Sequence, residues 1–132
     1  MPTTQLTEDS FDTEIDKDGI VLVDFWADWC GPCRAFAPIY EEASNRHPDV
    51  KFGKVDTEAN PNLSASFQVR AIPMMMVFRD GVIVFSHSGM LPAAGLDEII
   101  KEVKALDMDE VKKKIAEQEA QAPSQEEFES ED

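Results

Sequence analysis

The run Ile20–Phe25, with the sequence IVLVDF, restricts the possible fold more than any other segment of the chain. Five of its six residues are apolar, and such a β-rich run is typical of a central strand buried on both faces of a sheet. A strand of this kind requires other elements to pack on both sides of it. Asp24 is the exception in the run, because an ionised carboxylate without a partner is costly to bury. We therefore expect Asp24 to be protonated, paired or placed at the margin of the sheet.

Helix and strand patterns alternate along the rest of the chain. They indicate, in order, a short strand from Leu6, a helix capped by Thr7, a helix after Cys33 that contains Pro38, a strand over 49–56, a helix opened by 60–62, two strands within 74–89 and a helix from Pro92. Arg79-Asp80-Gly81 joins the last two strands, and Asp-Gly between apolar runs is a strong hairpin signal. This order predicts the α/β class, with a central mixed β-sheet flanked by α-helices on both faces.

The length and composition indicate one ordinary globular domain. The chain has 132 residues, of which 42% are hydrophobic, and this is enough to build a core without disulfide staples. Its net charge of -15 argues against binding to nucleic acid or to an anionic membrane, because phosphate recognition needs clustered basic residues. The first residues lack the pattern of a signal peptide, and no run is long enough to span a membrane. We therefore expect a cytoplasmic monomer, in which a purely structural disulfide is disfavoured.

Cys30 and Cys33 are the only cysteines in the sequence, and they follow the buried strand and open a helix. The unpaired N–H groups and the dipole at a helix start stabilise an anion, so we expect a lowered thiol pKa for Cys30. Pro32 lacks an N–H that would be unpaired at this position, and Gly31 allows another chain to approach closely. Half of a zinc site is the alternative, but the chain has no second cysteine pair to complete it. We expect no metal and no cofactor.

A lowered thiol pKa explains only a small part of the rate of a fast thiol–disulfide exchange. A shift from about 8.5 to about 7 raises the thiolate fraction at neutral pH about 16-fold, whereas the intrinsic nucleophilicity of the sulfur falls about 5-fold. The net gain in rate is therefore only about 3-fold. Most of the rate must come from docking the target disulfide in line with the sulfur and from the second cysteine, which resolves the mixed disulfide.

The segment WCGPC at 29–33 resembles the active-site motif of the thioredoxin family. The resemblance covers about residues 4–106. Further positions match the family pattern in order and approximate spacing, namely Asp24, Pro38, Lys54, Ile72-Pro73, Gly81 and Gly89. The resemblance implies the thioredoxin fold and a protein-disulfide reductase that works by dithiol-disulfide exchange. It also implies a role in electron transport and cell redox homeostasis, with protein disulfides as substrates and thioredoxin reductase as the electron donor.

The resemblance also implies a role for each matching residue. Cys30 would be the exposed nucleophile, and Cys33 would be the more buried thiol that resolves the mixed disulfide. Asp24 would accept or relay the proton of Cys33, with Lys54 as its charge partner. Pro73 would be cis and would leave the adjacent backbone free to pair with an extended substrate. The residues expected to bind the substrate around Pro73 are Trp29, Gly31, Pro32, Ala71, Ile72, Met74 and Gly89.

Met74 departs from the family pattern, because threonine is usual after the cis-proline position. Met75 and Met76 follow it in the sequence. One interpretation is that Met74 places a polarizable thioether beside the sulfurs and changes the redox potential or the fit of the substrate. The other is that Met75 and Met76 belong to the strand core and that Met74 is a tolerated variant.

The chain continues beyond the part that resembles the family. We expect a thioredoxin domain over residues 1–106, an amphipathic helix over 107–122 and an acidic, disordered tail over 123–132. Asp107 and Glu110 have the spacing of a capping box. The apolar face of this helix either packs on the domain or binds a partner. The alternative function is therefore a binding module or co-chaperone whose extension recruits a partner.

Overall fold

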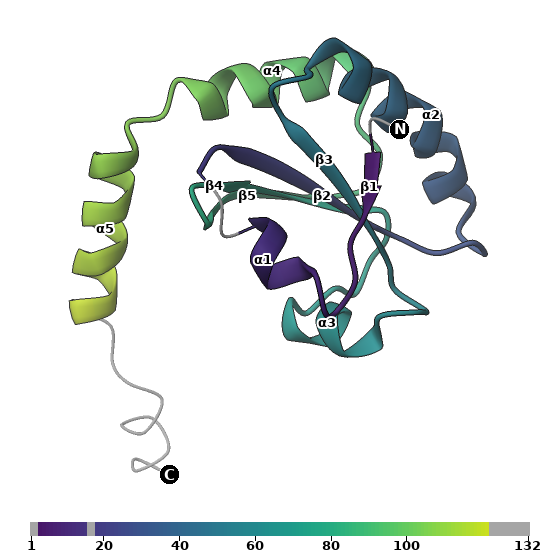
Figure 1. Cartoon of the computed structure of the whole chain (residues 1–132), viewed down its shortest axis with the longest axis horizontal. Helices are drawn as coiled ribbons and strands as arrows, with labels where there is room; N and C mark the ends of the chain where they lie inside the picture. Colours follow the sequence, from purple (N-terminus) through teal and green to yellow (C-terminus); the bar gives the residue numbers. More distant parts are fainter. Residues whose placement is uncertain (1–2, 16–17, 122–132) are drawn as a thin grey trace, which may run out of the picture.

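The computed structural model of the chain describes residues 3–15 and 18–121. Within these ranges the helices and strands follow the order expected from the sequence (Figure 1). The elements are β1 (Thr3–Gln5), α1 (Phe11–Ile15), β2 (Ile20–Trp26), α2 (Gly31–Arg46), β3 (Lys51–Asp56), α3 (Pro61–Ser66), β4 (Met74–Arg79), β5 (Val82–Ser88), α4 (Ala93–Lys104) and α5 (Met108–Gln121). The acidic tail expected over 123–132 lies outside the described residues.

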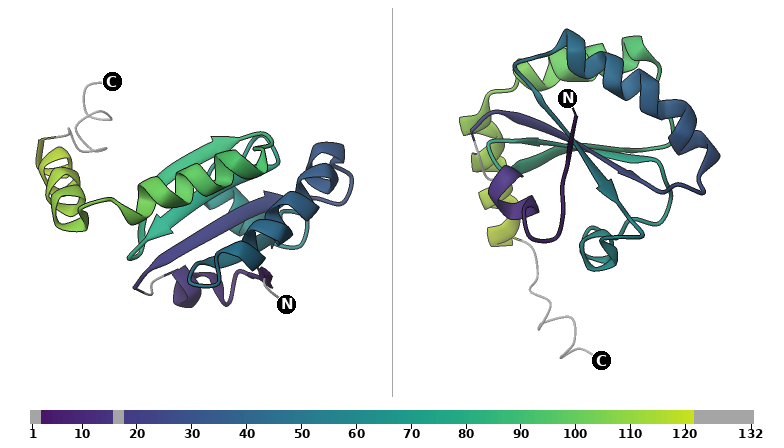
Figure 2. Two further views of the ribbon diagram at one scale, coloured as in Figure 1. Left: turned by 90° about the horizontal axis from the view of Figure 1, so that it is seen from above. Right: turned by 45° about the vertical axis from the view of Figure 1, so that its right-hand side comes forward.

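The strands form one mixed sheet in the order β1-β3-β2-β4-β5. β3 is parallel to both β1 and β2, whereas β4 is antiparallel to β2 and to β5. Helices α2 and α4 cover one face of the sheet, and α1 and α3 cover the other (Figures 1 and 2). This arrangement confirms the predicted α/β fold, with the buried run of the sequence as the central strand.

The core is divided between the two faces of the sheet, because successive side chains of a strand point to opposite faces. Leu22 packs in the cluster that contains the buried residues of α2 and α4. Val21, Val23 and Phe25 pack in the cluster on the opposite face, with residues of α1 and α3. Asp24 is two residues from Leu22, so its side chain points to the face that α2 and α4 cover.

The first strand lies before the position predicted for it, and regular α-helix begins later than the pattern suggests. β1 ends before Leu6, which is buried in the core. Residues 8–10 form a turn, and regular α-helix begins only at Phe11. In this turn the hydroxyl of Thr7 accepts a hydrogen bond from the backbone N–H of Ser10 at 3.2 Å. This is the bond of an N-cap residue, and the Thr7 carbonyl also accepts from the backbone N–H of Phe11 at 2.9 Å, so Thr7 caps the first helix as predicted.

Asp80 and Gly81 form the turn between β4 and β5, as predicted. Their φ angles are 53° and 82°, the positive values that two-residue hairpin turns favour. Asp80 also accepts a hydrogen bond from the backbone N–H of Gly19 through Oδ1 at 2.8 Å, and its own N–H donates to the Gly19 carbonyl at 2.8 Å. Gly19 directly precedes β2, so these bonds tie the hairpin to the start of the central strand.

Arg79, the last residue of β4, fixes the end of α4 to the sheet. Its Nη1 atom donates to the carbonyl oxygens of Val103, Lys104 and Leu106 at 2.5, 3.1 and 2.9 Å. The last carbonyl groups of a helix have no partner within it and carry partial negative charge, so a guanidinium is favourable there. The junction between α4 and α5 is thereby held by the β4–β5 hairpin.

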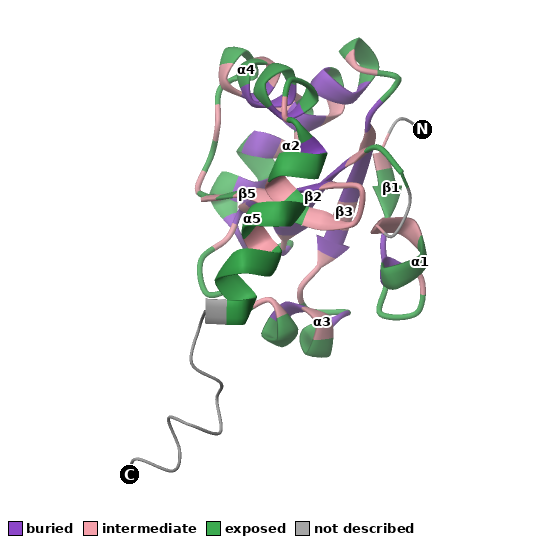
Figure 3. Cartoon of the chain, turned by 90° about the vertical axis from the view of Figure 1, so that its left-hand side faces the viewer, coloured by how far each residue is buried: buried purple, intermediate pink, exposed green. Residues whose placement is uncertain are grey.

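Helix α5 begins with the predicted cap. Asp107 Oδ1 accepts a hydrogen bond from the backbone N–H of Glu110 at 3.2 Å. Met108 is buried, and Val111 and Ile115 are half-buried, so the apolar residues follow the spacing expected for one face. The other side chains described on α5 are exposed (Figure 3). Among the residues that the structure describes, no helix is both long enough and apolar enough to cross a lipid bilayer.

Candidate redox-active site

The two cysteines lie at the start of α2, directly after β2. Cys30 is the N-cap residue and has an extended backbone, with φ -89° and ψ 109°. Its Sγ atom accepts a hydrogen bond from the backbone N–H of Cys33 at 3.2 Å. Pro32 lies in the first turn, where its missing N–H costs nothing. The helix start therefore directs a donor at the sulfur of Cys30, and this favours a thiolate there.

Cys30 and Cys33 are joined by a disulfide bond, with 5.2 Å between their Cα atoms. Both residues are buried in this oxidised form, with exposed fractions of 4% and 3%. The structure therefore differs from the expectation that Cys30 is exposed and Cys33 is the more buried thiol. The reason is local packing, because Trp26 and Ile72 pack against the cluster that the two cysteines form with Ala27. Exposure alone does not distinguish the attacking sulfur from the resolving sulfur.

The segment that precedes β4 lies against the disulfide. The carbonyl oxygen of Ile72 is 3.6 Å from Cys30 Sγ. The peptide bond between Ile72 and Pro73 is cis, as the resemblance implies. The carbonyl of Pro73 accepts a hydrogen bond from the N–H of Gly89 at 2.8 Å, and Gly89 has a φ of 100°, which favours glycine. Residues that follow β2, precede β4 and follow β5 thus meet around the cysteines.

The predicted substrate-binding residues differ in exposure. Trp29 precedes Cys30 and is 66% exposed. Of the others, Gly31, Pro32 and Ala71 are exposed, Ile72, Met74 and Gly89 are half-buried, and Pro73 is buried. Met90, which the sequence patterns did not single out, is an exposed large apolar residue directly after Gly89. The only feature of the sequence that points to Met90 is its position directly after Gly89, which is one of the predicted substrate-binding residues.

The three consecutive methionines of β4 point to alternate faces of the sheet. Met75 is buried in the cluster that packs against α2 and α4. Met76 is buried in the cluster on the opposite face, and Met74 is half-buried against the same cluster. Met75 and Met76 are therefore core residues of the strand. The influence of Met74 on the redox potential stays a prediction.

Asp24 lies in the central strand, and only 1% of it is exposed. Neither of its carboxyl oxygens has a hydrogen-bond partner within the described residues. Burial raises the pKa of Asp24 from 3.8 to about 7, and the positive charge of Lys54 opposes this rise. The register of β2 and β3 places Lys54 beside Asp24 in the sheet. Asp24 can therefore gain or lose a proton near neutral pH.

Lys54 connects the buried carboxylate with the cysteines. Its Nζ atom lies 5.2 Å from the centroid of the Trp26 ring, a distance typical of a cation–π contact. Lys54 and Cys33 line one cavity of about 200 Å³. The complete lining of this cavity is Trp26, Ala27, Asp28, Cys33, Arg34, Ala37 and Lys54. The cavity therefore places Lys54 near Cys33, the cysteine expected to resolve the mixed disulfide.

Side chains of the types that bind metals occur throughout residues 3–15 and 18–121. These ranges contain no group of three or more His, Cys, Asp or Glu side chains that is arranged to hold a metal ion. The sulfur atoms of Cys30 and Cys33 are bonded to each other.

The site and the fold define a class of protein, and comparison with known proteins identifies the family. A disulfide at a helix start, beside a cis-proline segment on a mixed sheet, is the arrangement of a dithiol-disulfide oxidoreductase. Residues 2–102 match the family model described as thioredoxin. The chain is 50% identical over 120 residues to the putative thioredoxin 2 of Streptomyces coelicolor, a match that covers 91% of the chain and 90% of that protein. It is 40% identical over 97 residues to a thioredoxin of Listeria monocytogenes, with 73% of the chain and 93% of that protein covered.

The chain belongs to the thioredoxin family. With its Cys30–Cys33 pair, it is a thiol-disulfide oxidoreductase that acts on protein disulfides. The match to the Streptomyces protein is longer than the match to the family model, so it includes part of the chain beyond residue 102.

Proposed function

We propose that the protein is a cytoplasmic protein-disulfide reductase and that thioredoxin reductase returns it to the dithiol form. The observation that carries this proposal is the disulfide at the start of α2, with the Ile72-Pro73 segment against it and Asp24 buried in the adjacent strand. In this role the protein takes part in electron transport and cell redox homeostasis. It acts as a monomer and needs no cofactor.

Cys30 is the proposed nucleophile. Its thiolate attacks one sulfur of the target disulfide, so that a mixed disulfide forms and the other target sulfur leaves as a thiolate. The hydrogen bond from the Cys33 N–H to Cys30 Sγ supports this assignment, because it stabilises negative charge on that sulfur. Cys33 then loses its proton and attacks Cys30 Sγ, which forms the internal disulfide and releases the second target thiolate. The target gains two electrons, and the protein loses two.

Asp24 is the proposed base for Cys33, and Lys54 is its proposed charge partner. With a pKa of about 7, a large fraction of Asp24 is ionised at neutral pH and able to accept a proton. The charge of Lys54 lowers the pKa of Asp24 and so favours the carboxylate. The cavity that Cys33 and Lys54 line supports the role of Lys54, because it places this charge beside the resolving thiol.

The proposed docking surface accepts an extended segment of the target protein beside the cysteines. The backbone next to Pro73 would pair with this segment as an added strand would, while apolar side chains cover it. The high exposure of Trp29 and the contact of the Ile72 carbonyl with Cys30 Sγ support this placement. The residues of the surface are Trp29, Gly31, Pro32, Ala71, Ile72, Pro73, Met74 and Gly89.

Reduction of insulin in the presence of NADPH and thioredoxin reductase tests this function. We expect the wild-type protein to consume NADPH catalytically and to reduce the insulin disulfides. A wild-type protein that the reductase reduces but that leaves insulin intact would have another target class. An inactive wild type would instead support a binding role.

Replacement of Met74 by threonine tests whether this residue tunes the redox couple. We expect the reduction potential of the Cys30/Cys33 pair to change by about 10 to 30 mV, which is about 0.5 to 1.4 kcal/mol for a two-electron couple. The physical reason is the loss of a polarizable thioether directly after Pro73. The measurement is equilibration with glutathione at several ratios, together with insulin reduction. If neither the potential nor the insulin rate changes, Met74 is a tolerated variant.

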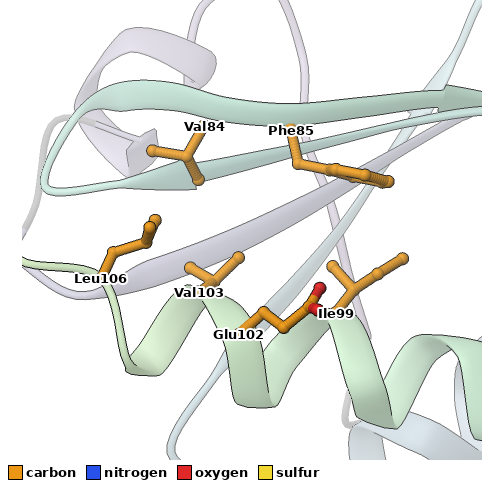
Figure 4. Close-up of a pocket in the computed structure, with 6 residues that line it drawn as sticks. All are labelled: Val84, Phe85, Ile99, Glu102, Val103 and Leu106. Carbon is orange, nitrogen blue, oxygen red and sulfur yellow. The ribbon is translucent and has the colours of Figure 1, made fainter. Parts of the chain in front are cut away.

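A second candidate function is that of a binding module that acts through the C-terminal extension. We propose a thioredoxin domain over 1–106, a helical extension over 107–122 and an acidic tail over 123–132. The observation in favour of a binding role is a mainly apolar groove of about 170 Å³ between β5 and α4, next to the start of α5 (Figure 4). Its lining residues are Val84, Phe85, Ile99, Glu102, Val103 and Leu106.

Substitution on the apolar face of α5 distinguishes packing on the domain from a surface kept for a partner. Val111→Ser combined with Ile115→Ser is expected to change the free energy of unfolding by less than about 1 kcal/mol, because both side chains are only half-buried. Met108→Ser is the matched control, and we expect a loss of about 2 kcal/mol or more because Met108 is buried. Urea unfolding of the full chain provides the measurement. An equal loss in both variants would mean that the whole face packs on the domain.

The same double variant also tests whether the extension takes part in catalysis. We expect insulin reduction to stay within about 2-fold of the wild-type rate, because α5 and the start of α2 lie at opposite ends of the sheet (Figure 1). A large loss of activity in a folded variant would instead assign the extension to the enzymatic function.

A further inference from the structure

Tyr40 is a buried titratable residue that takes part in none of the proposed reaction steps. It lies on α2 seven residues after Cys33, so both side chains lie on the same side of the helix. No part of Tyr40 is exposed. Its ring lies between those of Phe36 and Phe52, with centroid distances of 5.7 and 5.1 Å. This packing keeps the ring in the layer between α2 and the sheet.

The hydroxyl of Tyr40 forms a single well-defined bond to the sheet. It donates to the carbonyl oxygen of Gly53 on β3 at 2.8 Å, in a buried environment. Gly53 directly precedes Lys54, and in the sheet it pairs with Val23, which directly precedes Asp24. Burial in the first place, and then the charge of Asp24, raises the pKa of Tyr40 well above its usual range. The hydroxyl therefore keeps its proton and stays a donor at every working pH.

The groups around Asp24 come from every element that packs against it. β3 contributes Lys54, α2 contributes Tyr40, and β4 contributes Met75, which carries no charge. Cys33 lines the same cavity as Lys54. His87 of β5 pairs with Met75 and is the next titratable group in the same row of the sheet.

We propose that Tyr40 is a positioning residue for the exchange reaction. Through its bond to Gly53 it holds α2 at a fixed height above β3, and thereby holds Cys33 in place relative to Asp24 and Lys54. The carboxyl oxygens of Asp24 have no hydrogen-bond partner among the described residues, so no direct bond of Asp24 fixes this geometry. The inference rests on the proposed function, in which Asp24 takes the proton of Cys33.

Tyr40→Phe removes the bond and keeps the ring. The side-chain hydrogen bond that joins α2 to the carbonyl of Gly53 on β3 is then lost. We expect the helix to shift slightly above the carboxylate. Because a displacement of about 1 Å of a reacting group can cost up to about 100-fold in rate, even a fraction of that shift slows the attack of Cys33.

The lifetime of the mixed disulfide measures the attack of Cys33 directly. Reduced protein is mixed with a peptide disulfide, the reaction is quenched with acid, and the mixed disulfide is quantified by mass spectrometry between pH 6 and 9. The variants are Tyr40→Phe, Asp24→Asn and the two combined. We expect Tyr40→Phe to lengthen the lifetime about 3- to 10-fold at pH 7 and to move the midpoint of its pH profile. In the Asp24→Asn background the same substitution should change the lifetime by less than about 2-fold.

The matched control is Ser64→Ala, which removes a hydroxyl that donates to the Asn60 carbonyl at 3.1 Å on α3, at the opposite face of the sheet. We expect it to lower the melting temperature without moving the pH midpoint. If the effect of Tyr40→Phe persists in full in the double variant, or if its pH midpoint equals that of the wild type, Tyr40 has only a structural role and the inference is wrong. An Asp24→Asn protein with the wild-type lifetime and pH profile would instead overturn the role of Asp24 in the proposed function, and the inference with it.

Discussion

Replacement of Cys30 by serine is expected to reduce insulin reduction to the background rate without protein. A serine hydroxyl is not ionised at neutral pH and forms no disulfide, so neither the mixed disulfide nor the internal disulfide is accessible. The expected loss is therefore complete, and a residual rate of more than about 1% of the wild type would contradict the assignment. NADPH consumption coupled to thioredoxin reductase measures the rate.

The matched variant Cys33→Ser separates the roles of the two sulfurs. We expect Cys30 to attack normally in this variant and the reaction to stop at the mixed disulfide, which mass spectrometry detects as an adduct on Cys30. Both cysteines are almost equally buried in the oxidised form, so exposure does not show which sulfur attacks the target. Trapping of the mixed disulfide does show it. Adducts on Cys33 in the Cys30→Ser protein, with none on Cys30 in the Cys33→Ser protein, would reverse the two roles.

Replacement of Asp24 by asparagine is expected to stabilise the folded protein at pH 8. The pKa of Asp24 is raised from 3.8 to about 7 in the folded state, so between these values the folded state holds a proton that the unfolded state has lost. Stability therefore falls as the pH rises from about 4 to about 7 and changes no further above that. A shift of this size corresponds to about 4 kcal/mol at most, of which we expect the substitution to recover about 2 kcal/mol or more.

The pH dependence of this gain is the informative measurement. Urea unfolding of the wild type and of Asp24→Asn at pH 4 and pH 8 isolates the ionisation of one group, because all other carboxylates are common to both proteins. We expect a difference close to zero at pH 4 and the full gain at pH 8. An equal difference at both values would show that the ionisation of Asp24 does not destabilise the fold. Together with slower resolution of the mixed disulfide, the expected result would show that the buried carboxylate trades stability for reactivity.

Local sequence patterns are sufficient for the central elements of this fold. The run IVLVDF forms the predicted central strand, because a strand covered on both faces buries successive apolar residues. Asp80 and Gly81 form the predicted turn, because both adopt positive φ without much cost. The cysteine pair opens a helix as expected, since Pro32 is suited to the first turn. Each of these features depends on residues that are close in sequence.

Features that depend on contacts between distant segments are less accessible from the sequence. The burial of Cys30 depends in part on Ile72, which contacts its sulfur from more than 40 residues away, and no local pattern contains this contact. The pairing of Asp24 with Lys54 depends on the register of two strands, which the resemblance supplied and the spacing alone does not. The hydrogen bond from Tyr40 to Gly53 also joins distant segments. The helix pattern predicts that the ring of Tyr40 is in the core, but it does not predict the partner of the hydroxyl.

Strand β4 connects the cis-proline segment with the end of α4. It begins directly after Pro73, whose neighbour Ile72 contacts Cys30, and it ends at Arg79, which bonds the last carbonyl groups of α4. Six residues of extended chain span about 20 Å, and a strand paired on both sides transmits displacement with little bending. Because Arg79 also bonds the carbonyl of Leu106, the start of the extension and the cis-proline segment are connected through one strand that is paired on both sides.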